Sequence, residues 1–149
     1  MINDIKMYLM QGKYEELEKI CENIEISKIR EKMMIIAYET ENISVFSFAQ
    51  YMVQKTNHRE WIKMLIDIMI NPLCFVEGAY SVALFYARKL LSLDRNVENL
   101  EKMLFFYNIP EKLLHIEEAV DIVEEILKIE PQNRIALEIK FQQKENENE

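Results

Sequence analysis

Two histidines and two cysteines are the residues of this chain best suited to metal binding or nucleophilic chemistry. Neither His58 nor His115 has a cysteine, histidine or carboxylate four residues later, the spacing that places two ligands on one helix face. Cys21 and Cys74 lack CxxC spacing and lie among apolar neighbours. We therefore expect no metal site and no cofactor, and we interpret both cysteines as small core residues of a reduced, cytoplasmic protein.

Carboxylates could act as general acids or bases if burial or a nearby charge shifted their pKa. The acidic pairs Glu15-Glu16 and Glu124-Glu125 fall instead on predicted solvated helix faces, with lysines interspersed. Glycine occurs only at positions 12 and 78, so a glycine-rich phosphate loop cannot form. No nucleophile elbow or Ser-His-Asp order is present. The sequence therefore predicts no catalytic residues and a protein that is not an enzyme.

The composition predicts an all-α protein with one core. The 149 residues are 50% hydrophobic and 30% charged, with only two glycines and three prolines for tight turns. The most apolar stretch, residues 61–76, contains Lys63, Asp67 and the Asn71-Pro72 break, whereas a membrane span needs about 20 uninterrupted apolar residues. Residues 1–4 do not begin a secretion signal. We expect no membrane partner.

The net charge of −8 lies mainly in the last quarter of the chain. Residues 111–149 hold 11 acidic and 5 basic side chains, a net charge of −6. Such a surface repels phosphate backbones, so we expect no nucleic-acid partner. The basic residues Lys28, Arg30 and Lys32 are interpreted as a solvated helix face.

Apolar residues recur at three- and four-residue spacing almost throughout the chain. With cap and turn residues, this pattern predicts helices over residues 3–11, 13–24, 28–40, 43–56, 58–70, 78–93, 97–108, 112–129 and 133–144. Asn57, with Glu60 three residues later, is the predicted cap of the fifth helix. Prolines 72 and 110 end the fifth and seventh helices, because proline cannot continue the hydrogen-bond ladder. Residues 1–142 are predicted to form one domain, and residues 143–149 an acidic, frayed tail.

Similar segments recur along the chain. The segment that begins at Glu77 aligns with the one that begins at Glu41, 36 residues earlier, and this places Gly78 opposite Asn42. Both residue types tolerate a left-handed turn. Gly12 and Gly78 each precede a tyrosine by two residues. We predict four helical hairpins that turn at Gly12, Asn42, Gly78 and about Leu114, at spacings of 30, 36 and 36 residues, and a C-terminal capping helix. Each hairpin must stack on the next to complete its core, as in an α-solenoid.

The segment from residue 118 to residue 133 resembles the second helix of a tetratricopeptide repeat. It has a small residue at Ala119 and the aliphatic pair Ile126-Leu127. It then has Glu130-Pro131-Gln132-Asn133, in the acidic, proline, any, asparagine order of that family. The resemblance is best over about residues 78–140. The 36- and 30-residue spacings differ from the family's period of about 34, so a generic α-solenoid is the alternative.

The resemblance implies a groove, lined by the first helix of each hairpin, that holds a peptide or helix of another protein. Carried over to this chain, it implies the partner-binding residues Lys32, Ile36, Ile68, Leu104 and Asn108. At the positions that correspond to the family's clamp for a terminal carboxylate, no hairpin has both the lysine and the asparagine, so recognition of a chaperone C-terminus is not expected. Aromatic clusters at residues 46–51, 85–86 and 105–107, with nine methionines, are typical of a core that leaves an adaptable apolar patch.

The sequence therefore predicts a non-enzymatic adaptor or regulatory module that binds a protein or peptide. Two alternatives stay open. One is a peptide-sensing regulator, as in bacterial proteins that use tetratricopeptide arrays. The other is an immunity or antitoxin-type inhibitor whose acidic surface covers a basic partner. Homo-oligomerisation through an end of the stack or the acidic C-terminal helix is compatible with the sequence.

Overall fold

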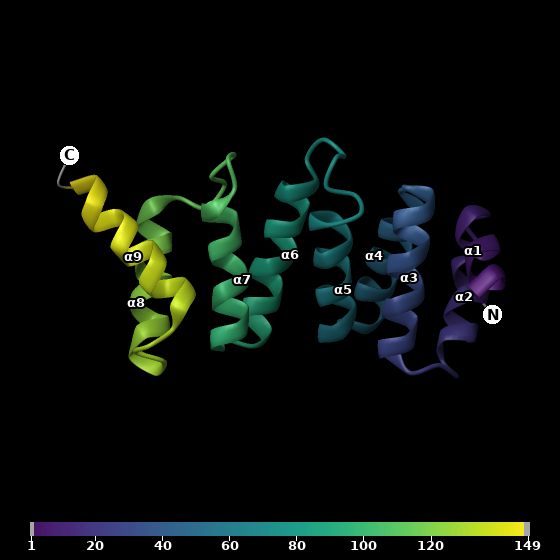
Figure 1. The fold of residues 1–149 in the computed structure, drawn as a ribbon. Helices are drawn as coiled ribbons and strands as arrows, with labels where there is room; N and C mark the ends of the chain where they lie inside the picture. Colours follow the sequence, from purple (N-terminus) through teal and green to yellow (C-terminus); the bar gives the residue numbers. More distant parts are fainter. Residues whose placement is uncertain (1, 148–149) are drawn as a thin grey trace. The chain divides into compact units, whose positions relative to one another are not determined.

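The computed structural model describes residues 2–147, and these form helices and turns without a β-strand (Figure 1). The helices are α1 (Ile2–Met10), α2 (Tyr14–Cys21), α3 (Ile26–Thr40), α4 (Ser44–Thr56), α5 (Arg59–Ile70), α6 (Ala79–Leu93), α7 (Val97–Asn108), α8 (Ile116–Ile129) and α9 (Arg134–Glu147). The predicted all-α class is confirmed. Over the described residues, no helix combines the length and the apolar character that crossing a membrane requires.

Most helices begin and end within two residues of the predicted positions. The exception at an N-terminus is α8, which begins four residues late. Lys112 adopts a left-handed conformation, with φ of +44°, and the Leu114 N–H donates to the Phe106 carbonyl at 3.1 Å. These two features hold residues 112–115 outside the helix. At the other end of the chain, α9 continues to Glu147, and residues 148 and 149 of the predicted tail lie outside the described residues.

The hairpin turns use left-handed backbone at Gly12 and Gly78, with φ of +68° and +84°. The second turn differs from the prediction, because Glu41 and not Asn42 has the positive φ, at +51°. The Asn42 side chain has another role there: its Oδ1 accepts the Ser44 N–H at 2.8 Å, at the start of α4. The turn therefore lies one residue earlier than the sequence indicated.

Asn57 ends α4 and does not cap α5, contrary to the prediction. It lies in the left-handed region, with φ of +50°. The cap of α5 is His58, whose Nδ1 accepts the Glu60 N–H at 3.2 Å. The imidazole thus satisfies one of the free N–H groups at a helix N-terminus, a structural role.

The chain divides into two compact units, unit 1 (Met1–Tyr86) and unit 2 (Ala87–Glu149). The single domain over residues 1–142 stays a prediction. Each unit is described by itself. Helix α6 contributes residues 79–86 to unit 1 and residues 87–93 to unit 2.

In unit 1, α4 packs most extensively on α5 and also contacts α1, α2 and α3 (Figure 1). The Tyr14 hydroxyl lies 2.9 Å from Ser44 Oγ, which itself donates to the Leu9 carbonyl, so the first two hairpin turns are joined. Further side-chain bonds link α2 with α4 through Glu18 and Lys55, and α4 with α6 through Gln50 and Tyr86. The even-numbered helices of this unit are therefore neighbours.

The odd-numbered helices of unit 1 are joined in the same way. Lys6 of α1 pairs with Glu39 of α3 at 3.7 Å, and Arg30 of α3 pairs with Asp67 of α5. Alternate helices thus contact one another on both sides of the unit.

In unit 2, α8 packs between α7 and α9, and α9 slants across α8 (Figure 1). Arg88 of α6 and Arg95, which lies in the turn between α6 and α7, form two-bond ion pairs with Glu118 and Glu125 of α8. Asn133 caps α9, because its Oδ1 accepts the Ala136 N–H at 3.0 Å. Its Nδ2 also donates to Glu101 of α7 at 2.6 Å. Asn133, the last residue of the segment Glu130-Pro131-Gln132-Asn133, therefore holds the start of α9 against α7.

The two arginine–glutamate pairs predict a pH dependence of stability. Hydrogen bonds from Arg88 and Arg95 lower the pKa of Glu118 and Glu125 below 4.5 in the folded chain. A lowered carboxyl pKa contributes stability above the unfolded value, and this stability is lost as the pH falls through the folded value. Because the groups are partly exposed, we expect a coupling of about 0.5 kcal/mol for Arg88 and Glu118 at neutral pH, and none at about pH 2. A double-mutant cycle with Arg88→Ala and Glu118→Ala in urea measures it, and a coupling that persists in acid contradicts the account.

Candidate functional site

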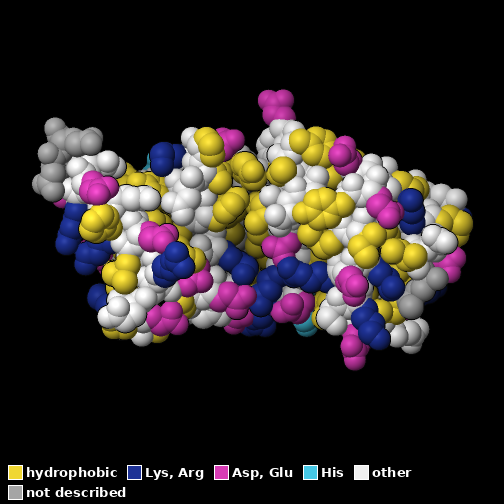
Figure 2. All heavy atoms as spheres, in the orientation of Figure 1, with side chains coloured by type: hydrophobic (Ala, Val, Ile, Leu, Met, Phe, Trp, Pro, Cys, Tyr) yellow, Lys and Arg dark blue, Asp and Glu magenta, His cyan; other side chains and the backbone are white. Residues whose placement is uncertain are grey.

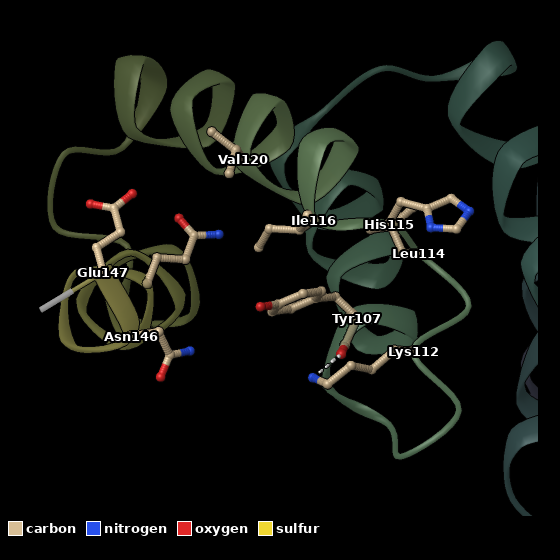
Figure 3. A pocket seen from close by; sticks show the side chains of 9 residues that line it. Tyr107, Lys112, Leu114, His115, Ile116, Val120, Asn146 and Glu147 are labelled. Atoms are coloured by element: carbon tan, nitrogen blue, oxygen red, sulfur yellow. Dashed lines mark hydrogen bonds between the residues drawn. The ribbon is translucent and has the colours of Figure 1, made fainter. Parts of the chain in front are cut away.

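A pocket of about 550 Å³ opens in unit 2 between the end of α7, the loop after it, the start of α8 and the last turns of α9 (Figure 3). Its apolar wall is formed by Tyr107, Leu114, Ile116 and Val120. Its polar lining is formed by Lys112, His115, Gln143, Asn146 and Glu147. A concave site that is mostly apolar, with a few polar groups, is the usual form of a ligand-binding pocket.

The loop between α7 and α8 positions one side of the pocket. Helix α7 ends at Asn108, before Ile109 and Pro110. The left-handed Lys112 then reverses the chain, and the backbone bond from Leu114 to Phe106 fastens the loop to the last turn of α7. The Leu114 side chain is buried. The loop is therefore anchored by its own side chain and backbone, and it presents Ile116 at the start of α8.

Tyr107 is the aromatic group of the pocket. Figure 3 shows its ring directed toward α9, with Ile116 and Val120 of α8 on the same side. The Lys112 ammonium lies 4.5 Å from the ring centroid and donates to the Tyr107 carbonyl at 3.3 Å. A cation over an aromatic ring is attracted by the negative ring face, so Lys112 is held at the rim. The pocket therefore combines an apolar wall with a fixed positive charge at its edge.

Gln143 of α9 provides a buried hydrogen-bond donor. Its Nε2 is inaccessible to solvent and has no hydrogen-bond partner among the described residues. A buried donor without an acceptor costs about 1–3 kcal/mol, so the folded chain gains if something supplies one. An oxygen acceptor would do so once a small movement of α9 or of the Gln143 side chain exposed Nε2 to the pocket.

The other chemically capable residues lie elsewhere or point away. The His115 ring is directed away from the pocket (Figure 3). Burial, and to a lesser extent Glu18, raises the pKa of the Cys21 thiol to about 11, so its nucleophilic thiolate is disfavoured. Cys74 is exposed, contrary to its prediction as a core residue, because α5 ends at Ile70 and Cys74 falls in the turns before α6. Residues 2–147 place no three or more His, Cys, Asp or Glu side chains together for a metal ion.

No family model, curated protein or solved structure matches this chain. Its candidate site therefore rests on the geometry of the described residues. That geometry is an apolar pocket with a positive rim and a free buried donor.

The five predicted partner-binding residues are divided between the units. Ile36 and Ile68 of unit 1 and Leu104 of unit 2 have no exposed side-chain surface, so they lie in the core of the folded chain. Lys32 is half-buried on α3, and Asn108 is exposed at the end of α7, next to Tyr107 in the chain. These two stay predictions.

Of two important pocket residues, the sequence indicated one and gave no signal for the other. Tyr107 belongs to the aromatic cluster at residues 105–107, so its type and position were visible as an apolar-patch candidate. Gln143 gave no such signal, because it follows the last apolar residue of the periodic pattern, Phe141. Its role depends on how α9 packs on α8.

Proposed function

We propose that this protein is a non-enzymatic module with tetratricopeptide-like helical-repeat architecture that binds a peptide or helix of a partner protein. The observation that carries the proposal is the unit 2 pocket, with its apolar wall at Tyr107, Ile116 and Val120 and its free donor at Gln143. Through this binding, the protein would act as an adaptor or regulator of the partner that carries the bound peptide or helix.

Side-chain contacts at regular spacing support the repeat architecture. Tyr14 bonds to Ser44, 30 residues on, and Gln50 bonds to Tyr86, 36 residues on. These are the spacings predicted between the first three hairpin turns. The Arg88–Glu118 and Arg95–Glu125 pairs both span 30 residues. All of these contacts except the Arg95 pair join the second helices of successive predicted hairpins, as stacking of similar hairpins would require; Arg95 lies just after α6.

The chemistry of the pocket favours a polypeptide ligand. An apolar side chain would fill the space beside Tyr107, Ile116 and Val120. A neighbouring backbone carbonyl would accept from Gln143 Nε2, which needs an oxygen acceptor. A peptide supplies an apolar group and a carbonyl within one residue, and an anchored side chain dominates the affinity of such complexes.

Tyr107→Ala is expected to weaken the binding of a selected peptide at least tenfold, because truncation removes the largest apolar surface of the pocket. Peptides would be selected from a displayed library on the full chain, and affinities measured by titration calorimetry. Tyr38→Ala is the matched control, because Tyr38 is an exposed tyrosine of α3 in unit 1. Equal affinity for the Tyr107 variant and the wild type contradicts the proposal.

Gln143→Glu separates the polar contact from the apolar one. It keeps the size of the side chain but replaces the donor by a carboxylate, which repels a carbonyl acceptor. We expect several-fold weaker binding, whereas the same change at Gln54, an exposed glutamine of α4 in unit 1, leaves the affinity within twofold.

The acidic surface of α8 favours the inhibitor as second candidate. Glu117, Asp121 and Glu124 are exposed at intervals of four and three residues, which aligns them on one helix face. Glu118 and Glu125 are already paired with arginines. A basic partner on this face would bind less tightly at higher salt. The combined substitutions Glu117→Lys, Asp121→Lys and Glu124→Lys would abolish its binding. A peptide-sensing regulator would use the pocket, so Tyr107→Ala distinguishes it from the inhibitor.

A further inference from the structure

The outer face of α9 is apolar in its centre and charged at its ends. Its inner face packs on α8 through the buried Ala136 and Ile139. On the opposite side, Leu137 is 39% exposed and Phe141 is 65% exposed. These two line a hollow of about 370 Å³ together with Glu138 and Gln142. Figure 2 shows hydrophobic side chains at the surface where α9 lies, beside acidic and basic ones.

This face differs from a solvated helix face. A helix face that stays in contact with water is usually polar. Leu137 and Phe141 are one helical turn apart and form a continuous apolar strip instead. Exposed apolar strips with a polar rim are typical of surfaces that another protein covers.

The charges at the two ends of the apolar strip indicate which partner fits this face of α9. With 100° of rotation per residue, Arg134, Leu137, Phe141 and Glu145 all fall within an 80° sector of α9. The strip thus runs from a positive end through two apolar side chains to a negative end. An antiparallel second copy of α9 that places Leu137 opposite Phe141 puts Arg134 level with Lys144 and one residue from Glu145, and of these two only Glu145 lies in the sector. A parallel copy would place like charges together, so the face is self-complementary only in the antiparallel sense.

We propose that the protein forms a symmetric dimer in which the outer faces of two α9 helices pack antiparallel through Leu137 and Phe141. Two equivalent pairs between Arg134 of one copy and Glu145 of the other fix the register. The dimer does not depend on the proposed peptide pocket. Gln143 lies 200° around the helix from Phe141, so the pocket side of α9 stays open.

Phe141→Glu is expected to raise the dimer dissociation constant at least tenfold in sedimentation equilibrium of the full chain. The substitution removes the centre of the apolar strip and introduces two buried charges into the symmetric interface. Phe85→Glu is the matched control, because Phe85 is 63% exposed on the part of α6 that belongs to unit 1, and it should leave association unchanged. Circular dichroism checks that both variants keep the helical content of the wild type.

Charge exchange tests the antiparallel register itself. Arg134→Glu and Glu145→Arg each place like charges opposite one another at both ends of the dimer, so each variant alone is expected to be monomeric. An equimolar mixture places opposite charges at both ends and should form a heterodimer. This rescue separates the interface from any local effect of losing the Arg134–Glu138 bond within α9.

Three outcomes overturn the proposal. One is a wild-type chain that stays monomeric at all concentrations, and another is a dimer that Phe141→Glu leaves intact. The third is a mixture of the two charge variants that associates no better than either variant alone. Peptide binding measured on the Phe141 variant reports the pocket separately, so failure of the dimer leaves the proposed function to its own test.

Discussion

Phe48→Ala lowers the free energy of unfolding by about 3–5 kcal/mol, the largest single-residue effect that we expect in unit 1. Phe48 of α4 is fully buried and contacts three other rings. Its ring centroid lies 5.5 Å from Tyr14 of α2, 6.1 Å from Tyr51 of α4 and 5.7 Å from Trp61 of α5. Alanine leaves a cavity where three helices meet, and both the lost burial and the cavity destabilise. Urea unfolding followed by Trp61 fluorescence and circular dichroism measures the loss.

The matched control for Phe48 is Phe85→Ala, since that ring is largely exposed. Its effect should stay within about 0.5 kcal/mol. A loss below about 1 kcal/mol for Phe48→Ala would mean that the four rings do not form the core of unit 1.

Ile68→Ala and Leu104→Ala are each expected to lower the free energy of unfolding by about 2–5 kcal/mol. Ile68 in α5 and Leu104 in α7 have no exposed surface, so alanine leaves a cavity in each unit. The sequence assigned both residues to a partner-binding groove. Unfolding in urea, measured beside peptide affinity at a temperature where the variants stay folded, distinguishes the two roles.

Lys32→Ala and Asn108→Ala are the surface controls for these core substitutions. They come from the same sequence prediction, but Lys32 is half-buried and Asn108 is exposed. Their effect on stability should stay within about 0.5 kcal/mol. If Ile68→Ala or Leu104→Ala weakens binding at least tenfold without a loss of stability, that residue acts at a surface and its described packing is wrong.

The helices were predictable because each buries one face, and this leaves apolar residues at a period of about 3.6. The glycine turns were also predictable, because positions 12 and 78 are the only glycines and both take a positive φ. The start of α8 was not predictable from the sequence. Nothing in the residue type of Lys112 indicates a left-handed conformation, which here depends on the loop being fastened to Phe106.

The groove residues could not be placed from the turns alone. Counting residues back from a turn predicts how far along the helix axis a residue lies. An error of one residue in the turn, however, changes the predicted direction of every side chain by 100°. The second turn lies at Glu41, one residue before Asn42. Moved by one, the predicted position at Ile36 becomes Ile35, which is 39% exposed where Ile36 is buried. The one-residue shift therefore accounts for the burial of Ile36. It does not account for that of Ile68, whose hairpin turns at the predicted Gly78.

The pocket was predictable in part. The aromatic cluster at residues 105–107 indicated surplus apolar surface there, and Tyr107 lines the pocket. Gln143 could not be assigned, because its burial arises from the packing of the last turns of α9 near α7 and α8. Such a contact between distant segments leaves no local sequence pattern.

Intermolecular nuclear Overhauser effects between a selected peptide and the labelled full chain test the pocket most directly. The account predicts contacts from one apolar peptide side chain to the Tyr107 ring and to the methyl groups of Ile116 and Val120. It also predicts a marked shift of the Gln143 side-chain amide as Nε2 gains its acceptor. Contacts confined to unit 1, with the Tyr107 and Gln143 signals unchanged, would contradict it.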